Sequence, residues 1–168
     1  TKELQASVAS AESWQARYEA AVKASHSVLY DANHLTGQVI FGGDCASILG
    51  YTADELNGDI GKWVALVHPD DRAIFLDEFR RVTGHGLPFH AEYRMMRKDG
   101  GIVWMRDDGH FVAGAPGGRP VRFVGFVRDV TTERRAEEQR VAEERARRQV
   151  AESLAERSAQ LEFALGAT

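Results

Sequence analysis

The sequence has one cysteine, no long apolar run and no excess of positive charge, and each absence excludes a class of protein. A single cysteine cannot form an internal disulfide, which points to a reducing compartment. No apolar segment approaches the roughly 20 residues that cross a bilayer, so we expect no membrane contact from this chain. The formal net charge of -4 offers no positive field for nucleic acid. Together these absences predict a cytoplasmic protein that binds neither a membrane nor nucleic acid.

The composition is that of a globular protein, since 43% of the 168 residues are hydrophobic and 27% are charged. Nearly all glycine, proline and aromatic residues lie in 26–131, which we predict to be a domain between helices at 1–25 and 132–168. The chain starts without an initiator methionine, so we expect a fragment of a longer protein. The pattern of residues 18–25 recurs at 161–168, which favours a further similar domain after the C-terminal helix.

Residues 1–25 and 132–165 lack glycine and proline, and each of these segments carries a narrow line of apolar side chains. In the first zone these side chains recur at spacings of three and four, as in a coiled coil. A long helix over 132–165 with so little apolar surface cannot bury itself on a small domain, so we predict a homodimer through both helices. The alternatives are an amphipathic helix packed on its own domain and a solvated single helix. The apolar lines consist of Leu4, Val8, Ala11, Tyr18 and Val22, and of Ala142, Ala146, Val150, Leu154, Leu161 and Leu165.

The middle zone predicts an α+β domain. A hairpin of strands at 28–30 and 38–41 comes first, and three strands at about 89–98, 102–113 and 120–130 come last. A segment rich in proline and glycine at 115–118 separates the last two strands. Short helices are predicted at 46–49, 53–56 and 60–67, followed by a stronger one from Pro69 to about 83.

The same zone carries short motifs whose order and spacing together are highly specific. They are Ile48-Leu49-Gly50-Tyr51, Val67-His68-Pro69-Asp70-Asp71-Arg72, Glu92-Tyr93-Arg94, Arg97-Lys98-Asp99-Gly100 with Trp104, and Gly125-Phe126-Val127-Arg128-Asp129-Val130-Thr131. With these motifs the chain resembles a PAS domain of bacterial sensory proteins. The resemblance implies a five-stranded antiparallel sheet, with short helices on one face, around a small cavity. It also implies a sensory or relay role beside an output domain in the parent chain, such as a histidine kinase, a cyclic-dinucleotide enzyme or a chemoreceptor.

A ligand pocket can be placed from strand alternation together with this resemblance. Alternation puts Phe123, Gly125 and Val127 on one face of the last strand, and the resemblance sets that face inward. From the helix that starts at Pro69, the pocket candidates are Ile74, Phe75 and Phe79. The competing interpretation is that these apolar residues simply form the core.

The residues argue against the cofactors found in similar proteins. Compared with flavin photoreceptors, Cys45 lies several residues too early and Val127 stands where a glutamine would contact the flavin. Haem-binding relatives usually offer a histidine from the helix that here spans 70–83, and this helix contains none. His85 and His90 are the minority candidates for a haem ligand. We therefore predict no cofactor and leave any small-molecule ligand unidentified.

No catalytic arrangement competes with a relay role, so we predict that this chain is not an enzyme. Two pairs of aspartates are adjacent, at 70–71 and 107–108. Neighbouring side chains of a strand point to opposite faces, and the pair at 70–71 is explained by the dipole of the helix that it starts. Asp129 and Thr131 stand where the last strand becomes the long helix, and a hydrogen bond or cap there can couple the two. We predict a dimeric sensory relay. The alternatives are a ligand-free module for dimerisation and spacing, or a haem-binding sensor.

Overall fold

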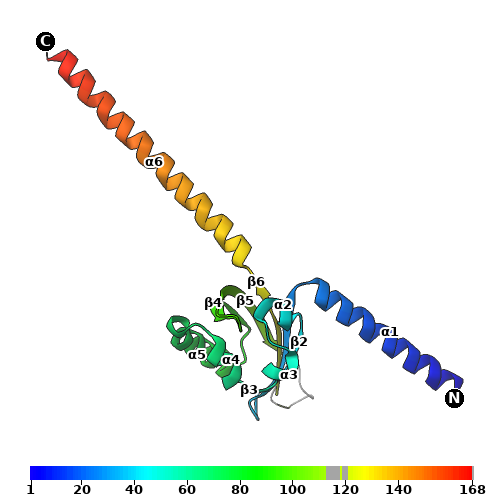
Figure 1. Ribbon diagram of the computed structural model, residues 1–168. Coiled ribbons are helices and arrows are strands. Elements are labelled where there is room, and N and C mark those ends of the chain that lie inside the picture. Colours follow the sequence, from blue (N-terminus) through cyan, green and yellow to red (C-terminus); the bar gives the residue numbers. More distant parts are fainter. Residues whose placement is uncertain (113–117, 119–120, 168) are drawn as a thin grey trace. The chain divides into compact units, whose positions relative to one another are not determined.

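Figure 1 shows a computed structural model of the chain, which describes residues 1–112, 118 and 121–167. The chain divides into two units, Thr1–Val130 and Thr131–Thr168. Residues 113 and 120, the outer ends of two predicted strands, lie outside the described residues. Residues 115–117 of the predicted connection and Thr168 lie outside them as well.

The first unit is built on an antiparallel sheet in the order β3-β2-β1-β6-β5-β4. Its strands are β1 (Ser27–Asn33), β2 (Gln38–Gly43), β3 (Gly58–Asp59), β4 (Phe89–Met96), β5 (Ile102–Phe111) and β6 (Arg122–Asp129). The five strands predicted from the sequence are present. The prediction missed the sixth, β3, which pairs with Gln38 and Val39 at the sheet edge. Two residues are too few to show an alternating pattern.

Four helices follow the first hairpin, and side chains cap the starts of two of them, α3 and α5. Thr52 and Glu55 form a capping box at the start of α3. At the start of α5 the His68 side chain accepts a hydrogen bond from the Asp70 amide, at 3.3 Å, and so caps this helix. The helices are α2 (Cys45–Leu49), α3 (Ala53–Leu56), α4 (Gly61–Leu66) and α5 (Pro69–Gly84).

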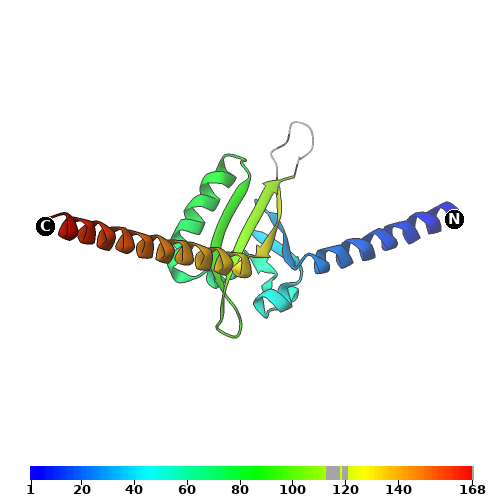
Figure 2. The same ribbon diagram turned by 90° about the horizontal axis from the view of Figure 1, so that it is seen from above.

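One face of the sheet is buried, and alternation along the strands decides which side chains reach it. In β5 the buried positions are Val103, Met105, Asp107 and Gly109, in strict alternation. The α5 helix lies next to β4, as Figures 1 and 2 show, and presents Phe75 to the buried face. The core therefore sits between the sheet and its helices, and a carboxylate is part of the buried row.

Two long helices flank the domain, as the absence of glycine and proline predicted. Helix α1 spans Lys2–Ala24 and helix α6 spans Thr131–Gly166, and neither contains a buried residue. Leu4 and Val8 of α1, and Leu154 and Leu161 of α6, are more than half exposed. Within the described residues, the structure contains no helix long and apolar enough to cross a membrane.

Candidate functional site

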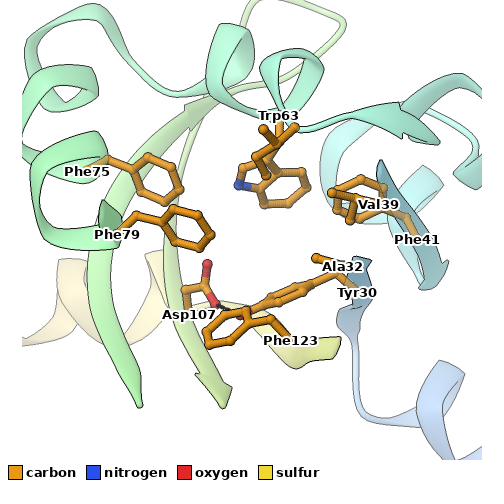
Figure 3. Close-up of a pocket in the computed structure, with 10 residues that line it drawn as sticks. Tyr30, Ala32, Val39, Phe41, Trp63, Phe75, Phe79, Asp107 and Phe123 are labelled. Carbon is orange, nitrogen blue, oxygen red and sulfur yellow. Dashed lines mark hydrogen bonds between the residues drawn. The ribbon is translucent and has the colours of Figure 1, made fainter. Parts of the chain in front are cut away.

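An aromatic cavity lies between the sheet and helices α4 and α5 (Figure 3). Its volume is about 20 Å³. A void of that size accommodates roughly one water molecule, so the cavity as it stands holds a single small group. The side chains that line it are Tyr30, Ala32, Val39, Phe41, Ile60, Trp63, Phe75, Phe79, Asp107 and Phe123. We call this the aromatic cavity.

The polar centre of the aromatic cavity is Asp107, whose exposed fraction is only 4%. Tyr30 donates its hydroxyl to Oδ1 of Asp107 at 2.8 Å, and Tyr93 donates to Oδ2 at 2.7 Å. The indole N–H of Trp63 donates in turn to the Tyr93 hydroxyl at 3.1 Å. One buried carboxylate thus connects strands β1, β4 and β5 with helix α4.

Burial perturbs the acid-base equilibrium of this cluster. Desolvation raises the pKa of Asp107 to about 7, although the hydrogen bonds from the two tyrosines act in the opposite direction. The pKa of Tyr30 is also raised, chiefly by burial and then by the neighbouring charge of Asp107. Both phenols therefore stay protonated at physiological pH and remain donors, while Asp107 titrates close to neutrality.

Two facing glycines make the contact between Tyr30 and Asp107 possible. Gly109 of β5 and Gly125 of β6 are paired across the strands. A Cβ at Gly109 would lie 2.0 Å from the Tyr30 hydroxyl oxygen, and a Cβ at Gly125 would lie 2.4 Å from it. Any larger residue at either position would occupy the space that the phenol crosses, so the glycines are required by the close approach of Tyr30.

The structure brings together only part of the pocket predicted from the sequence. Phe75, Phe79 and Phe123 line the aromatic cavity. Gly125 lies on the same side of the sheet but under the Tyr30 ring, and Val127 is buried in the core away from the cavity. The placement of Ile74 was wrong, because its side chain is 72% exposed. Phe75 and Phe79 are four residues apart and share one helix face, whereas Ile74 lies about 100° around the helix from Phe75.

The histidines considered as haem ligands lie outside the aromatic cavity. His85 ends α5, where its Nδ1 contacts the carbonyl of Arg81 at 2.7 Å. His90 is exposed on β4 and pairs with Asp108 at 2.5 Å. Neither side chain lines the cavity, and a volume of about 20 Å³ is far too small for a porphyrin. The residues present therefore do not fit a haem at this position.

Other chemical groups give no alternative site within the described residues. Cys45 is buried at the start of α2 with its Sγ 3.2 Å from the Gly42 carbonyl, and burial raises the pKa of its thiol to about 11. Such a thiol is protonated and unreactive at neutral pH. No group of three histidine, cysteine, aspartate or glutamate residues in the described part of the chain could hold a metal ion.

The sequence prediction missed the polar half of the site, which consists of Tyr30, Trp63, Tyr93 and Asp107. A signal was available for Asp107, because Val103 and Met105 stand four and two residues before it and share its face. Asp107 was instead interpreted as one of two adjacent carboxylates, a pattern with no catalytic meaning. The three aromatic donors come from distant parts of the chain, and alternation alone does not bring them together.

The proposed relay residues lie at the junction of the two units. Asp129 is the last residue of β6, and Thr131 is the first residue of α6. Val130 between them is fully buried, and its amide donates to the Trp104 carbonyl of β5 at 2.8 Å. The sheet therefore holds the chain up to the residue immediately before α6.

Comparisons with known proteins assign the fold. A family model described as "PAS fold" matches residues 39–127, which is more than half of the chain. The chain belongs to the PAS fold family. The sensory-box histidine kinase/response regulator of Burkholderia thailandensis is 31% identical, with a TM-score of 0.61, and the match covers 79% of this chain and 98% of that structure.

Two further proteins are similar to parts of this chain. The N-terminal domain of a diguanylate cyclase with a PAS/PAC sensor, from Marinobacter aquaeolei, shares the fold with a TM-score of 0.60 at 24% identity. It covers 64% of this chain, and the match includes 98% of that structure. An uncharacterized protein of Sinorhizobium fredii, y4lL, is 36% identical over 92 residues, which are 55% of this chain but only 11% of that protein. The chain spans about a ninth of the length of this curated relative.

Proposed function

We propose that this chain is the non-catalytic sensory module of a dimeric, multidomain signalling protein. The signal enters at the aromatic cavity or through α1, and it leaves through β6 into α6 across Asp129, Val130 and Thr131. An output domain in the parent chain receives it. The similarity to a sensory histidine kinase of Burkholderia thailandensis, at 31% identity, supports an output of this general kind.

The observation that carries the proposed relay is the anchoring of Val130. Its side chain is fully buried and its amide is hydrogen-bonded to Trp104, so strain in β5 or β6 reaches this residue directly. Phe123 of β6 lines the aromatic cavity, seven residues before Val130 on the same chain. A change at the cavity can therefore move the start of α6 without passing through a loop.

The exposed apolar lines of the flanking helices support the proposed dimer. In α6 the side chains of Val150, Leu154, Leu161 and Leu165 are each at least 60% exposed. An apolar line of this kind on a 36-residue helix is favourable only when another helix covers it. A second copy of the same helix presents the matching line.

A competing dimer surface exists on the outer face of the sheet. A groove of about 460 Å³ runs over this face, and the side chains of Ile40 and Phe126 at it are 66% and 47% exposed. If copies associate through this groove, the flanking helices are not needed for the dimer. The experiment on the proposed dimer must therefore distinguish an interface formed by the flanking helices from an interface formed by the sheet.

Sedimentation velocity on two charge variants of the whole chain tests the helical interface. The double variant Leu154→Glu and Leu161→Glu places charges on the apolar line of α6 and is expected to weaken association at least about tenfold. The control Ser153→Glu and Gln160→Glu adds the same charges one residue earlier on the helix, off the apolar line. Unchanged association of the leucine variant, with Phe126→Glu disrupting it, would move the interface to the sheet.

A ligand-free module for dimerisation and spacing is the second candidate function. The volume of the aromatic cavity, about 20 Å³, favours it because no drug-sized metabolite fits without rearrangement. Mass spectrometry of small molecules released from the purified protein separates the two functions. A stoichiometric metabolite would support sensing by a larger ligand.

A further inference from the structure

The hydrogen-bonding character of the aromatic cavity restricts what can bind in it. The hydroxyls of Tyr30 and Tyr93 both donate to Asp107, and the indole of Trp63 donates to Tyr93. Among the described side chains of this cluster, every donor is therefore used. The capacity that remains belongs to acceptors, namely the carboxylate oxygens of Asp107 and the Tyr30 oxygen. A ligand that meets this cluster must bring its own donors.

The electrostatics of the aromatic cavity favour a positive charge. Asp107 is a buried carboxylate, and an isolated buried charge is unfavourable unless a partner neutralises it. The rings of Trp63, Phe75 and Phe79 surround it, and the face of an aromatic ring attracts a cation. An anionic ligand would meet the like charge of Asp107 and no free donor.

Size selects among cations. The volume of about 20 Å³ accommodates a group about as large as one water molecule, and an ammonium group has about that size. Figure 3 shows Asp107 on the sheet side, with Trp63, Phe75 and Phe79 on the helix side. An ammonium group between them would donate to the carboxylate and place its remaining N–H bonds against the rings.

We propose that the aromatic cavity is a binding site for a compact ammonium group, held by the Asp107 carboxylate and the surrounding aromatic rings. This inference rests on the proposed sensory role of the cavity and names its ligand class. The source is either the free ammonium ion or the head group of a small primary amine. In both cases the contact to Asp107 is the same.

Protons compete with the ammonium group for Asp107. Burial raises the pKa of Asp107 to about 7. Tyr30 of β1 and Tyr93 of β4 face Asp107, while the charges of Asp108 of β5 and His90 of β4 act on it from the other face of the sheet. The two phenols stay protonated across the range in question, while His90 is engaged with Asp108. Below pH 7 the carboxyl is neutral, so ammonium binding is expected to weaken about tenfold between pH 8 and pH 6.

A titration of the whole 15N-labelled chain with ammonium chloride, followed by NMR, tests this proposal. The indole N–H of Trp63 is two hydrogen bonds from Asp107 and serves as the reporter, with Trp14 of α1 as an internal control. At pH 8 we expect a saturable shift of the Trp63 signal that equimolar potassium chloride does not produce. The same titration at pH 6 should show the weaker affinity.

Asp107→Asn keeps the shape, removes the charge and should lower the affinity at least about tenfold. Asp99→Asn removes an exposed carboxylate that does not line the aromatic cavity, and this control should retain binding. Methylammonium distinguishes the sources: a shift equal to that of ammonium supports an amine head group, and a response to ammonium alone supports the free ion.

Three results would overturn the proposal: no saturable shift with either cation, an equal shift with potassium chloride, or an affinity that does not depend on pH. The pH dependence is measured on the unaltered protein, so it tests the role of Asp107 even if the Asp107→Asn variant does not fold. The proposed dimeric relay is judged separately by sedimentation of the α6 variants, and it can stand when the titration fails.

Discussion

The buried carboxylate of Asp107 makes the stability of this domain depend on pH in an unusual direction. Its pKa rises from 3.8 in an exposed aspartate to about 7 in the folded protein, because burial penalises the charged form. Between these values the folded state binds a proton that the unfolded state has lost. The contribution of Asp107 to stability is therefore fully present below about pH 4 and is lost as pH rises through 7.

The size of the effect follows from the shift of the pKa. A shift of about three units corresponds to about 4 kcal/mol, since each unit is worth about 1.4 kcal/mol. That is a large part of the roughly 5–15 kcal/mol that stabilises a typical domain. Ordinary salt-bridged carboxylates act in the opposite direction: Arg94 lowers the pKa of Asp71, so the Asp71 contribution is lost in acid.

The measurement is a set of urea unfolding curves between pH 4 and pH 8 for the unaltered protein and for Asp107→Asn. The variant lacks the titrating group but keeps nearly the same shape. We expect the unfolding free energy of the unaltered protein, minus that of the variant, to fall by about 4 kcal/mol from pH 4 to pH 8. Asp71 and the other carboxylates titrate in both proteins and cancel in this difference.

A difference that stays flat over this range would refute the reasoning, because Asp107 would then be ionised with an ordinary pKa in the folded state. A difference that rises with pH would refute it more strongly, since it would mean that the tyrosine hydrogen bonds outweigh burial. A carboxyl 13C titration of the folded protein gives an independent midpoint, which we expect near pH 7.

Two further predictions concern the cluster and the junction. Gly125→Ala places a methyl group 2.4 Å from the Tyr30 hydroxyl and should cost about 1–3 kcal/mol in urea unfolding, whereas Gly42→Ala, which meets nothing within 4 Å, should cost far less; equal costs would contradict the packing argument. Asp129→Ala and Thr131→Ala should speed hydrogen exchange at residues 132–137 and leave the core strands unchanged, because losing a cap costs about 0.5–2 kcal/mol. Loss of protection throughout the sheet would mean that these residues hold the fold together, and the relay hypothesis would fail.

Much of the fold could be predicted from local signals in the sequence. The strand Phe89–Met96 largely alternates apolar and polar residues. A turn with Asp99 and Gly100 joins it to the strand Ile102–Phe111, and the two strands pair as a hairpin. Pro69 and the two aspartates after it correctly indicated the start of α5. These signals work because each depends on neighbours within a few residues.

The site was less predictable because its parts meet only in the folded chain. The Tyr30–Asp107 contact joins residues 77 positions apart, and the Trp63–Tyr93 contact joins residues 30 positions apart. Ile74 was predicted to line the pocket because it is apolar, as are Phe75 and Phe79 on the same helix. Phe75 faces the cavity, whereas Ile74, one residue earlier on the helix, points toward solvent.

Two features that lower stability converge on the contact between Tyr30 and Asp107. Glycine weakens a strand interior, yet Gly109 and Gly125 face each other in the middle of the sheet. A buried carboxylate is costly when ionised, yet Asp107 lies in an aromatic cavity where an asparagine could accept one hydrogen bond without charge. Strand propensity alone would favour larger residues at both glycines, and desolvation alone would favour a neutral residue at 107. The sequence departs from both preferences around the Asp107 carboxylate, and a functional role of this carboxylate explains these departures better than fold stability does. Such a function is the exchange of a proton for a compact cation at Asp107 near neutral pH, in a cavity that is also lined by Phe123 of β6, eight residues before the first residue of α6.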